Sequence, residues 1–401
     1  MTRAFLVAQP RFHLDSSSPG AAGSIILDQL ANLKDGQFRA VSLTRKNPSQ
    51  GKVIWIRENS ILWRLLWRVM RTTSLGKSLG RRQTLMLFGV FLWALWIRPK
   101  YLIVHTTKMA FADAIARLCR WCDVIVYHHT AEDQNRPEWQ VRSAVTHCRG
   151  HIFVSQYALS QFESGVKTLG CQLKNAYVIR NRVDCRRFRP DKEARLRTRT
   201  ALGVAEDVIV VLFSGRLIRR KGLDVLVEAY GLLDKDLRKN ICVVVAGAGD
   251  YGENGNLGEF ESYRPKWRDL VVQKQLVLCG YVEPSRMPRI MVSADILAFP
   301  ILMPEACGLV VLEAQACGVP VIVSNIGGTT EYFCDGVTGI GVSPGSAREL
   351  AVAIEWLARE REVRERMGAA ARKYVLRFHE AGSYGGELEG ALKKFEQTEG
   401  M

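Results

Sequence analysis

Short apolar runs alternate with longer mixed segments along most of the chain, and this alternation indicates the fold. Runs of three to six mainly aliphatic residues are typical of strands that are buried on both faces of a parallel sheet. They lie at 5–8, 101–105, 124–127, 152–155, 176–179, 208–213, 241–246, 276–278, 296–299 and 319–323. Helices are expected at 25–33, 61–71, 85–97, 110–122, 309–317, 352–372 and 386–395. Strands and helices in this order predict an α/β protein with doubly wound parallel sheets.

The 401 residues suffice for two such sheets, each with its own core. We expect a Rossmann-like N-terminal domain over 1–190 and a second, similar domain over 206–375. The polar and charged segment 191–205 between them is interpreted as a linker. The last residues, 376–401, are expected to form a helix that packs back toward the N-terminal domain.

Charge is distributed unevenly along the chain. The net charge is +16, and residues 1–100 contain 16 Lys and Arg against 4 Asp and Glu. This surplus implies an anionic partner for the N-terminal half. A recognisable nucleic-acid motif is missing, so we expect no nucleic-acid partner.

Segment 61–71 carries part of this charge, and it has arginines at helical spacing beside two tryptophans: Trp63, Arg64, Trp67, Arg68 and Arg71. Either it is a basic amphipathic helix that lies on anionic lipid, or it faces the core and exposes a basic side. The apolar segment 85–97 is shorter than the roughly 20 residues that span a bilayer, so a buried or interfacial helix is expected there.

The ten cysteines are scattered, and the sequence shows no secretory signal peptide, so reduced thiols and a cytoplasmic location are expected. Cys119 and Cys122 form a single C-x-x-C without a second pair at zinc spacing. Structural cysteines are therefore the simpler interpretation, and we expect no metal ion.

The segment 304–323 places two carboxylates, Glu305 and Glu313, in an apolar run. Glu is rarely buried without a partner. Gly308 before the run and Gly318 after it predict a short helix over 309–317. The N–H groups at the start of such a helix attract anionic oxygens. The spacing therefore suggests a ligand with a phosphate in the middle and a polyol at each end.

Two further positions are candidates because ligands of parallel sheets bind beyond the carboxyl ends of the strands. His128 and His129 follow one predicted strand, although a lone histidine is more often structural. Gly20 and Gly23 lie in the loop after the first strand, where a phosphate contact and an ordinary surface loop fit equally well.

Several motifs in succession resemble those of the retaining GT-B glycosyltransferases of family 4. They are Phe-Ser-Gly-Arg-Leu-Ile-Arg-Arg-Lys-Gly at 213–222, Val-Val-Ala-Gly-Ala-Gly at 244–249, the segment 305–313, Gly-Gly-Thr-Thr-Glu at 327–331 and Gly-Val-Thr-Gly at 336–339. The turn at 180–184 resembles the family's Asn-Gly-Val-Asp, with Arg182 in place of Gly. In the N-terminal half the resemblance is one of layout.

The resemblance implies a nucleotide diphosphate sugar as donor, UDP- or GDP-linked, with no cofactor. Arg216 and Lys221 would neutralise the diphosphate, which fits transfer without a metal ion. Glu305 would bind hydroxyls of the transferred sugar and Glu313 those of the ribose. The backbone N–H groups of Gly308, Leu309 and Val310 would hold sugar and phosphate oxygens.

From the N-terminal domain, His129 would contact the sugar, with His128 as the alternative because the pair leaves the register open. Gly20 and Gly23 would border the phosphates. The catalytic set that the resemblance implies is Glu305, His129, Lys221 and Arg216.

The implied activity is retaining transfer of a hexose to a hydroxyl of a glycan or lipid-linked acceptor, in the synthesis of cell-surface polysaccharide or glycolipid. The implied location is the cytoplasmic face of a membrane. A non-catalytic protein that binds nucleotide sugars on the same fold is the alternative.

Overall fold

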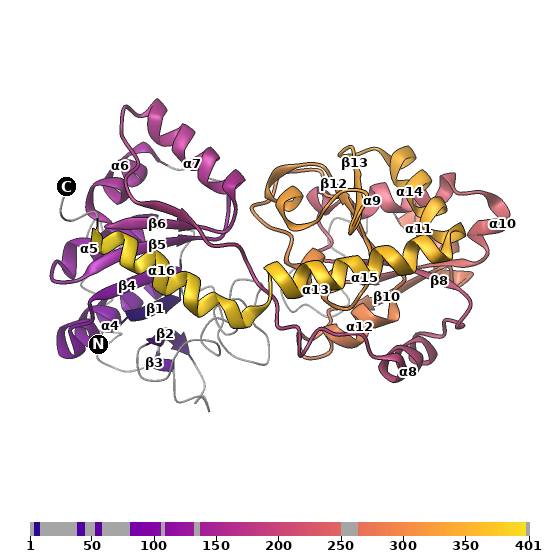
Figure 1. The fold of residues 1–401 in the computed structure, drawn as a ribbon, viewed down its shortest axis with the longest axis horizontal. Helices are drawn as coiled ribbons and strands as arrows, with labels where there is room; N and C mark the ends of the chain where they lie inside the picture. The colour runs from indigo at the N-terminus through magenta and orange to yellow at the C-terminus, as the bar shows by residue number, and fades with distance from the viewer. Residues whose placement is uncertain are drawn as a thin grey trace. The chain divides into compact units, whose positions relative to one another are not determined.

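A computed structural model describes residues 4–8, 38–44, 53–57, 81–105, 109–131, 137–249 and 264–397 (Figure 1). The chain forms two compact units. Unit 1 contains residues 1–181 and 381–401, and unit 2 contains residues 182–380. The predicted loop glycines Gly20 and Gly23, and the predicted helices 25–33 and 61–71, lie outside the described residues.

Unit 1 is built on a parallel sheet, which has seven strands in the described part of the chain, in the order β3-β2-β1-β4-β5-β6-β7. The strands are β1 (Ala4–Ala8), β2 (Phe38–Thr44), β3 (Val53–Arg57), β4 (Tyr101–His105), β5 (Asp123–His128), β6 (Gly150–Phe153) and β7 (Ala176–Val178). All five residues of β4 are buried, as expected for a central parallel strand. The helices between its strands are α4 (Arg81–Ile97), α5 (Met109–Leu118), α6 (Glu138–His147) and α7 (Gln156–Thr168).

The C-terminal helix α16 (Tyr384–Gln397) belongs to unit 1. Glu396 accepts hydrogen bonds from Lys100 Nζ at 2.6 Å and from the Tyr101 hydroxyl at 2.8 Å. Phe395 is fully buried, and its carbonyl accepts a bond from Arg149 Nη2 at 2.8 Å. The last helix therefore completes the core of the unit in which the chain begins.

Unit 2 contains a second parallel sheet, with six strands among the described residues, in the order β10-β9-β8-β11-β12-β13. Its strands are β8 (Ile209–Ser214), β9 (Ile241–Ala246), β10 (Leu276–Gly280), β11 (Ile296–Phe299), β12 (Val321–Ser324) and β13 (Gly339–Val342). Its helices are α8 (Lys192–Leu202), α9 (Leu223–Leu232), α10 (Lys235–Arg238), α11 (Arg264–Val272), α12 (Met287–Ser293), α13 (Leu309–Ala316), α14 (Ala347–Arg359) and α15 (Arg361–Phe378). Apolar residues pack on both faces of the sheet.

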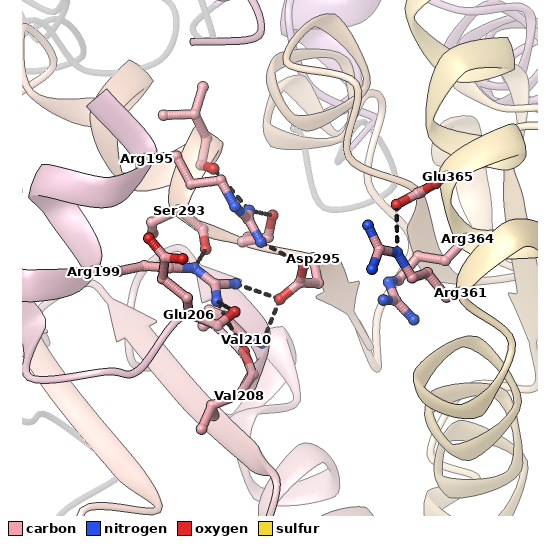
Figure 2. A network of polar contacts seen from close by, with 12 residues as sticks. Arg195, Arg199, Glu206, Val208, Val210, Ser293, Asp295, Arg361, Arg364 and Glu365 are labelled. Atoms are coloured by element: carbon pink, nitrogen blue, oxygen red, sulfur yellow. Dashed lines mark hydrogen bonds and ion pairs between the residues drawn. The ribbon is translucent and has the colours of Figure 1, made fainter. Parts of the chain in front are cut away.

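The predicted linker at 191–205 is wrong, because most of it is helix α8. Asp191 caps the helix by accepting a hydrogen bond from the Ala194 N–H at 2.9 Å, and Gly203 ends it in the left-handed conformation. The arginines of α8 are not all solvated. Arg199 is 1% exposed and pairs with Asp295, and Arg195 Nη2 lies 2.6 Å from the same carboxylate (Figure 2). High charge in this segment reflects an ion-pair network and not a flexible connection.

The boundary between the units also differs from the predicted residue 190. The chain passes from unit 1 to unit 2 after Asn181 and returns after Glu380. Arg182 Nη1 donates to the carbonyl of Phe378 at 3.0 Å, and the Val183 N–H donates to the carbonyl of His379 at 2.9 Å. The arginine in the Asn-Gly-Val-Asp-like turn thus ties the first crossing to the end of α15.

Two predicted helices differ most from those observed. The helix expected at 110–122 ends at Leu118, and the one expected at 352–372 is two helices, α14 and α15, separated at Glu360. The strands β2, β3 and β13 were not predicted. In the parts of the chain that the structure describes, no helix has the length and hydropathy that spanning a bilayer requires.

Candidate functional site

The order of the strands in unit 2 identifies one place where a ligand is expected. The sequence order of the strands reverses between β8 and β11, its central pair. In open parallel sheets, ligands bind in the crevice outside the carboxyl ends of the strands at such a switch point. The loop after β8 contains Arg216 and Lys221, and the loop after β11 contains Glu305 and Gly308.

Lys221 and Glu305 meet at this point. Lys221 Nζ lies 2.6 Å from Glu305 Oε1, and the two side chains are 15% and 18% exposed. Burial lowers the pKa of Lys221, the attraction of Glu305 opposes this shift, and the positive charges of Arg216 and Arg220 add to the lowering. The ammonium group also lies over the ring of Phe299, 5.1 Å from its centroid. The site therefore holds a concentrated positive charge that one carboxylate partly balances.

Close backbone packing fixes the loop that carries Lys221. Gly222 adopts φ +72°, and a Cβ there would lie 1.9 Å from the carbonyl oxygen of Pro300. The Leu302 N–H donates to the carbonyl of Arg220 at 2.9 Å. These contacts join the loop after β8 directly to the loop after β11. The ammonium group of Lys221 and the carboxylate of Glu305 are therefore held close together.

The backbone of Glu305 is held from its other side by the Gly-Gly-Thr-Thr segment, a 3₁₀ helix over Gly327–Tyr332. The Gly328 N–H donates to the carbonyl of Glu305 at 2.7 Å. Gly327 has φ +69°, and a Cβ there would lie 2.8 Å from both the backbone N and O of Glu305. Only glycine permits this approach, which explains one part of the 327–331 motif.

Gly308 directly precedes helix α13, and a larger residue in its place would be tightly packed. A Cβ at Gly308 would meet Phe299, Thr329 and Val311 at 3.0–3.1 Å. The helix has no side-chain cap, and the N–H groups of its first turn, those of Leu309 and Val310, have no acceptor within a regular helix. Glu313 lies on this helix, five residues and roughly 7.5 Å of axial rise after Gly308. The loop that leads into α13 also carries Glu305, the partner of Lys221, so an anion at the start of α13 would lie at the end of that loop.

In unit 1, the histidines occupy the carboxyl ends of β4 and β5. His105 Nδ1 lies 2.9 Å from His129 Nε2, and both rings stack on Tyr127. His128 is 1% exposed, stacks on Phe153 and lies 3.0 Å from His151 Nδ1. Burial lowers the pKa of His129 and of His151 to about 3 each. Of the tandem pair, His129 is the partly exposed residue and His128 is part of the core.

The structure thus brings together Lys221 and Glu305, with Arg216 near enough to affect the pKa of Lys221. It places Leu309, Val310 and Glu313 on the adjoining helix, with Gly308 just before its first residue. His129 lies in the other unit, and Gly20 lies outside the described residues. Within those residues, no cluster of three or more His, Cys, Asp or Glu side chains could hold a metal ion.

One residue beside the candidates in each unit was not predicted. The ring of Phe299 lies under the ammonium group of Lys221. Phe299 ends a predicted strand, so its position at the carboxyl edge of the sheet could have been inferred from the sequence. His105 also ends a strand, and the same argument that selected His129 applies to it.

Comparisons with known proteins agree with this arrangement. Residues 195–374 match the family model described as "Glycosyl transferases group 1". A D-inositol 3-phosphate glycosyltransferase of Paenarthrobacter aurescens is 34% identical over 223 residues, 53% of this chain and 50% of the relative. A GDP-mannose-dependent alpha-(1-6)-phosphatidylinositol monomannoside mannosyltransferase of Mycolicibacterium smegmatis is 31% identical over 233 residues, 56% of each chain. The chain spans about half the length of these curated relatives.

A solved structure extends the likeness to the whole fold. The crystal structure of Anabaena Alr3699/HepE in complex with UDP-glucose has a TM-score of 0.76 and 17% identity, and the match covers 98% of this chain and 99% of that one. The two parallel α/β units therefore define a GT-B fold, the architecture expected from the sequence. Unit 2 is similar to the glycosyl transferases group 1, the family whose model matches most of it.

Proposed function

We propose that this protein transfers a hexose from a nucleotide diphosphate sugar to a hydroxyl group of a glycan or lipid-linked acceptor. The observation that carries the proposal is the Lys221–Glu305 pair at the switch point of unit 2. A carboxylate beside a cation fits a ligand that presents sugar hydroxyls next to phosphate oxygens.

The cations stabilise the leaving group, the nucleoside diphosphate. When the sugar leaves, negative charge accumulates on the nucleoside diphosphate. Lys221 and Arg216 neutralise that charge, together with the first-turn N–H groups of α13 at Leu309 and Val310. Because Lys221 and Glu305 are mostly buried, their interactions with a bound ligand are stronger than they would be in water.

The carboxylates orient the two polyols. Glu305 accepts hydrogen bonds from hydroxyls of the transferred sugar, and Glu313 from those of the ribose. The backbone N–H of Gly308 binds an oxygen between them. In unit 1, His129 binds the sugar and Gly20 borders the phosphates.

We propose a UDP- or GDP-linked donor. Support comes from the Anabaena structure, which is described as a complex with UDP-glucose, and from the mannosyltransferase, which is named as GDP-mannose-dependent. The proposed reaction retains the configuration of the sugar: the leaving phosphate oxygen helps to deprotonate the acceptor hydroxyl on the same face. It requires no cofactor and no metal ion, because the fixed cations and helix N–H groups supply the positive charge.

The proposed acceptor and location are linked. The basic surplus of the first 100 residues supports work at an anionic surface, and the cytoplasmic face of a membrane fits a protein that makes cell-surface polysaccharide or glycolipid. We expect no nucleic-acid partner.

The alternative is a protein on this fold that binds nucleotide sugars without turnover. The retained set Arg216, Lys221, Glu305 and Glu313 favours the enzyme. The test measures the release of nucleoside diphosphate from a panel of UDP- and GDP-sugars, with and without extracted lipids added as the acceptor. Glu305→Ala and Lys221→Ala should each lower turnover at least about 100-fold while the protein stays folded. Wild-type turnover in both variants would refute the site, and binding without turnover in the wild-type protein would favour the alternative.

A further inference from the structure

The end of helix α4 presents large apolar side chains to solvent. The first part of the helix is buried, including Leu85, Met86 and Leu87. In its last turns the exposure reverses: Leu92 is 53% exposed, Leu95 44% and Trp96 77%. Single exposed apolar residues are normal on proteins, but a concentration of them in one place needs a reason.

The end of helix α5 extends the same surface. Leu118 and Trp121 are both exposed, and the ring of Trp121 lies 5.8 Å from that of Phe91 on α4. Figure 1 shows α4 and α5 together at one end of unit 1, and the two helices pack against each other. We call Leu92, Leu95, Trp96, Leu118 and Trp121 the α4–α5 surface.

The surface lies at the amino edge of the sheet. Helix α4 ends just before β4 begins, and α5 ends just before β5 begins. The candidate histidines are at the opposite, carboxyl edge of the same strands. A partner on the α4–α5 surface therefore leaves the edge that carries His129 open.

Arginines flank the surface. Arg98 follows α4, and Arg120 lies between Leu118 and Trp121; both are exposed. Within the described residues, neither forms an ion pair. Arg117 is also exposed and pairs with Asp113, a carboxylate that is largely buried. Apolar side chains with a rim of arginines fit a partner that is apolar inside and anionic at its surface.

We propose that the α4–α5 surface docks the protein on the surface of an anionic lipid bilayer. Tryptophan is enriched at membrane interfaces because its ring is apolar while its N–H stays near the headgroups. Leucines beside it enter the acyl boundary, and Arg98 and Arg120 meet anionic headgroups. The proposal rests on the membrane location given with the proposed function and names the surface that contacts the membrane. It does not depend on sugar transfer, because binding of the protein to lipid vesicles can be measured without a nucleotide sugar.

The test is co-sedimentation of the full chain with phosphatidylglycerol/phosphatidylcholine vesicles and with pure phosphatidylcholine vesicles, at low and high salt. Binding is expected to the anionic vesicles only, and to weaken as salt rises. Trp96→Ser should weaken partitioning about tenfold, the factor expected for one large apolar side chain withdrawn from lipid. Arg98→Asn with Arg120→Gln should weaken it about 30-fold. Asn suits the left-handed backbone of residue 98, whose φ is +47°.

The matched control is Trp139→Ser. Trp139 is 54% exposed and is the second residue of α6, which begins at the carboxyl edge of the same sheet. This variant should bind vesicles as the wild-type protein does. Equal binding by wild type and by both surface variants would overturn the proposal, as would no binding to anionic vesicles at low salt. Dimerisation in gel filtration that the surface variants abolish, without vesicle binding, would show that the surface joins two copies instead.

Discussion

Lys221 Nζ and Glu305 Oε1 lie 2.6 Å apart, although their loops follow two different strands, β8 and β11. Both side chains are more than four-fifths buried. Burial of two charges costs solvation energy that their attraction does not necessarily repay. A pair of this kind at a sheet switch point is better explained by ligand binding than by stability.

This interpretation predicts a specific pattern in a double-mutant cycle. Lys221→Met leaves Glu305 without its cation, and Glu305→Leu leaves Lys221 without its carboxylate. Each single variant should lose about 1–3 kcal/mol of unfolding free energy, while the double variant should lose less than either. Urea unfolding of the four proteins measures this. A double variant at least as unstable as the single variants would mean that the pair contributes to the stability of the fold.

Gly327 should be more sensitive to substitution than its backbone conformation alone requires. Gly327→Ala puts a Cβ 2.8 Å from the backbone of Glu305, so the loop that carries the carboxylate must move. Gly336 is the matched control, because it has φ +72° and no atom within 4 Å of a Cβ. Gly336→Ala should cost about 1 kcal/mol and leave donor affinity unchanged. Gly327→Ala should also weaken donor binding at least tenfold in a titration; equal affinity in the two variants would show that the position of Glu305 does not matter.

The network around Asp295 should be a main determinant of the stability of unit 2. Asp295 Oδ1 pairs with Arg195 at 2.6 Å, its other oxygen pairs with Arg199, and the Val210 N–H donates to it at 2.8 Å (Figure 2). Asp295→Asn should lower the unfolding free energy by about 3 kcal/mol, since it leaves a buried guanidinium without its anion.

The control for that variant lies on the same helix. Arg197 on α8 pairs with Glu193, and its side chain is 69% exposed. Arg197→Ala should change stability by less than about 0.5 kcal/mol. Thermal and urea unfolding of both variants compare them directly. Similar losses in the two would mean that α8 is stabilised by its surface charges and not by Asp295.

The buried histidine His151 should make unit 1 sensitive to mild acid. Burial lowers its pKa to about 3, below the ordinary value of 6.5. The folded state therefore binds fewer protons than the unfolded state between these values, and stability falls as the pH falls through 6.5 toward 3. Between pH 7.5 and 5.5 this residue should account for a loss of about 1 kcal/mol. In the His151→Phe variant, hydrogen exchange of β5 and β6 should show a correspondingly smaller loss of stability between these two pH values. The same loss as in the wild-type protein would show that His151 does not cause the acid sensitivity.

The sequence predicted the core strands well, because parallel strands buried on both faces are continuous aliphatic runs. Segments 241–246 and 296–299 have the bounds found in β9 and β11. It failed at 191–205, where charge was interpreted as exposure. The caps Asp191 and Gly203 were present in the sequence, but the partner of Arg199 is Asp295, far along the chain, and a local pattern does not reveal it.

In the candidate site, too, local motifs identified individual residues but not the contacts between distant segments. Glu305, Gly308 and Lys221 were selected from local motifs, and the structure brings the first and last of these into contact. The support for the pair comes from residues that motifs do not connect, such as Phe299 under the ammonium group and Gly327 against the backbone of Glu305. Contacts between loops depend on strand order, which the sequence alone did not give.

The central claim is that the Lys221–Glu305 site binds a nucleoside diphosphate, and a thermal-shift titration tests it most directly. A ligand that binds only the folded state must raise the unfolding temperature. UDP, GDP, UDP-glucose and GDP-mannose should be titrated against the wild-type protein, Lys221→Met and the control Gly336→Ala. We predict that at least one of them stabilises the wild-type and Gly336→Ala proteins and leaves Lys221→Met unchanged. Stabilisation of all three proteins to the same extent, or of none, would contradict the account.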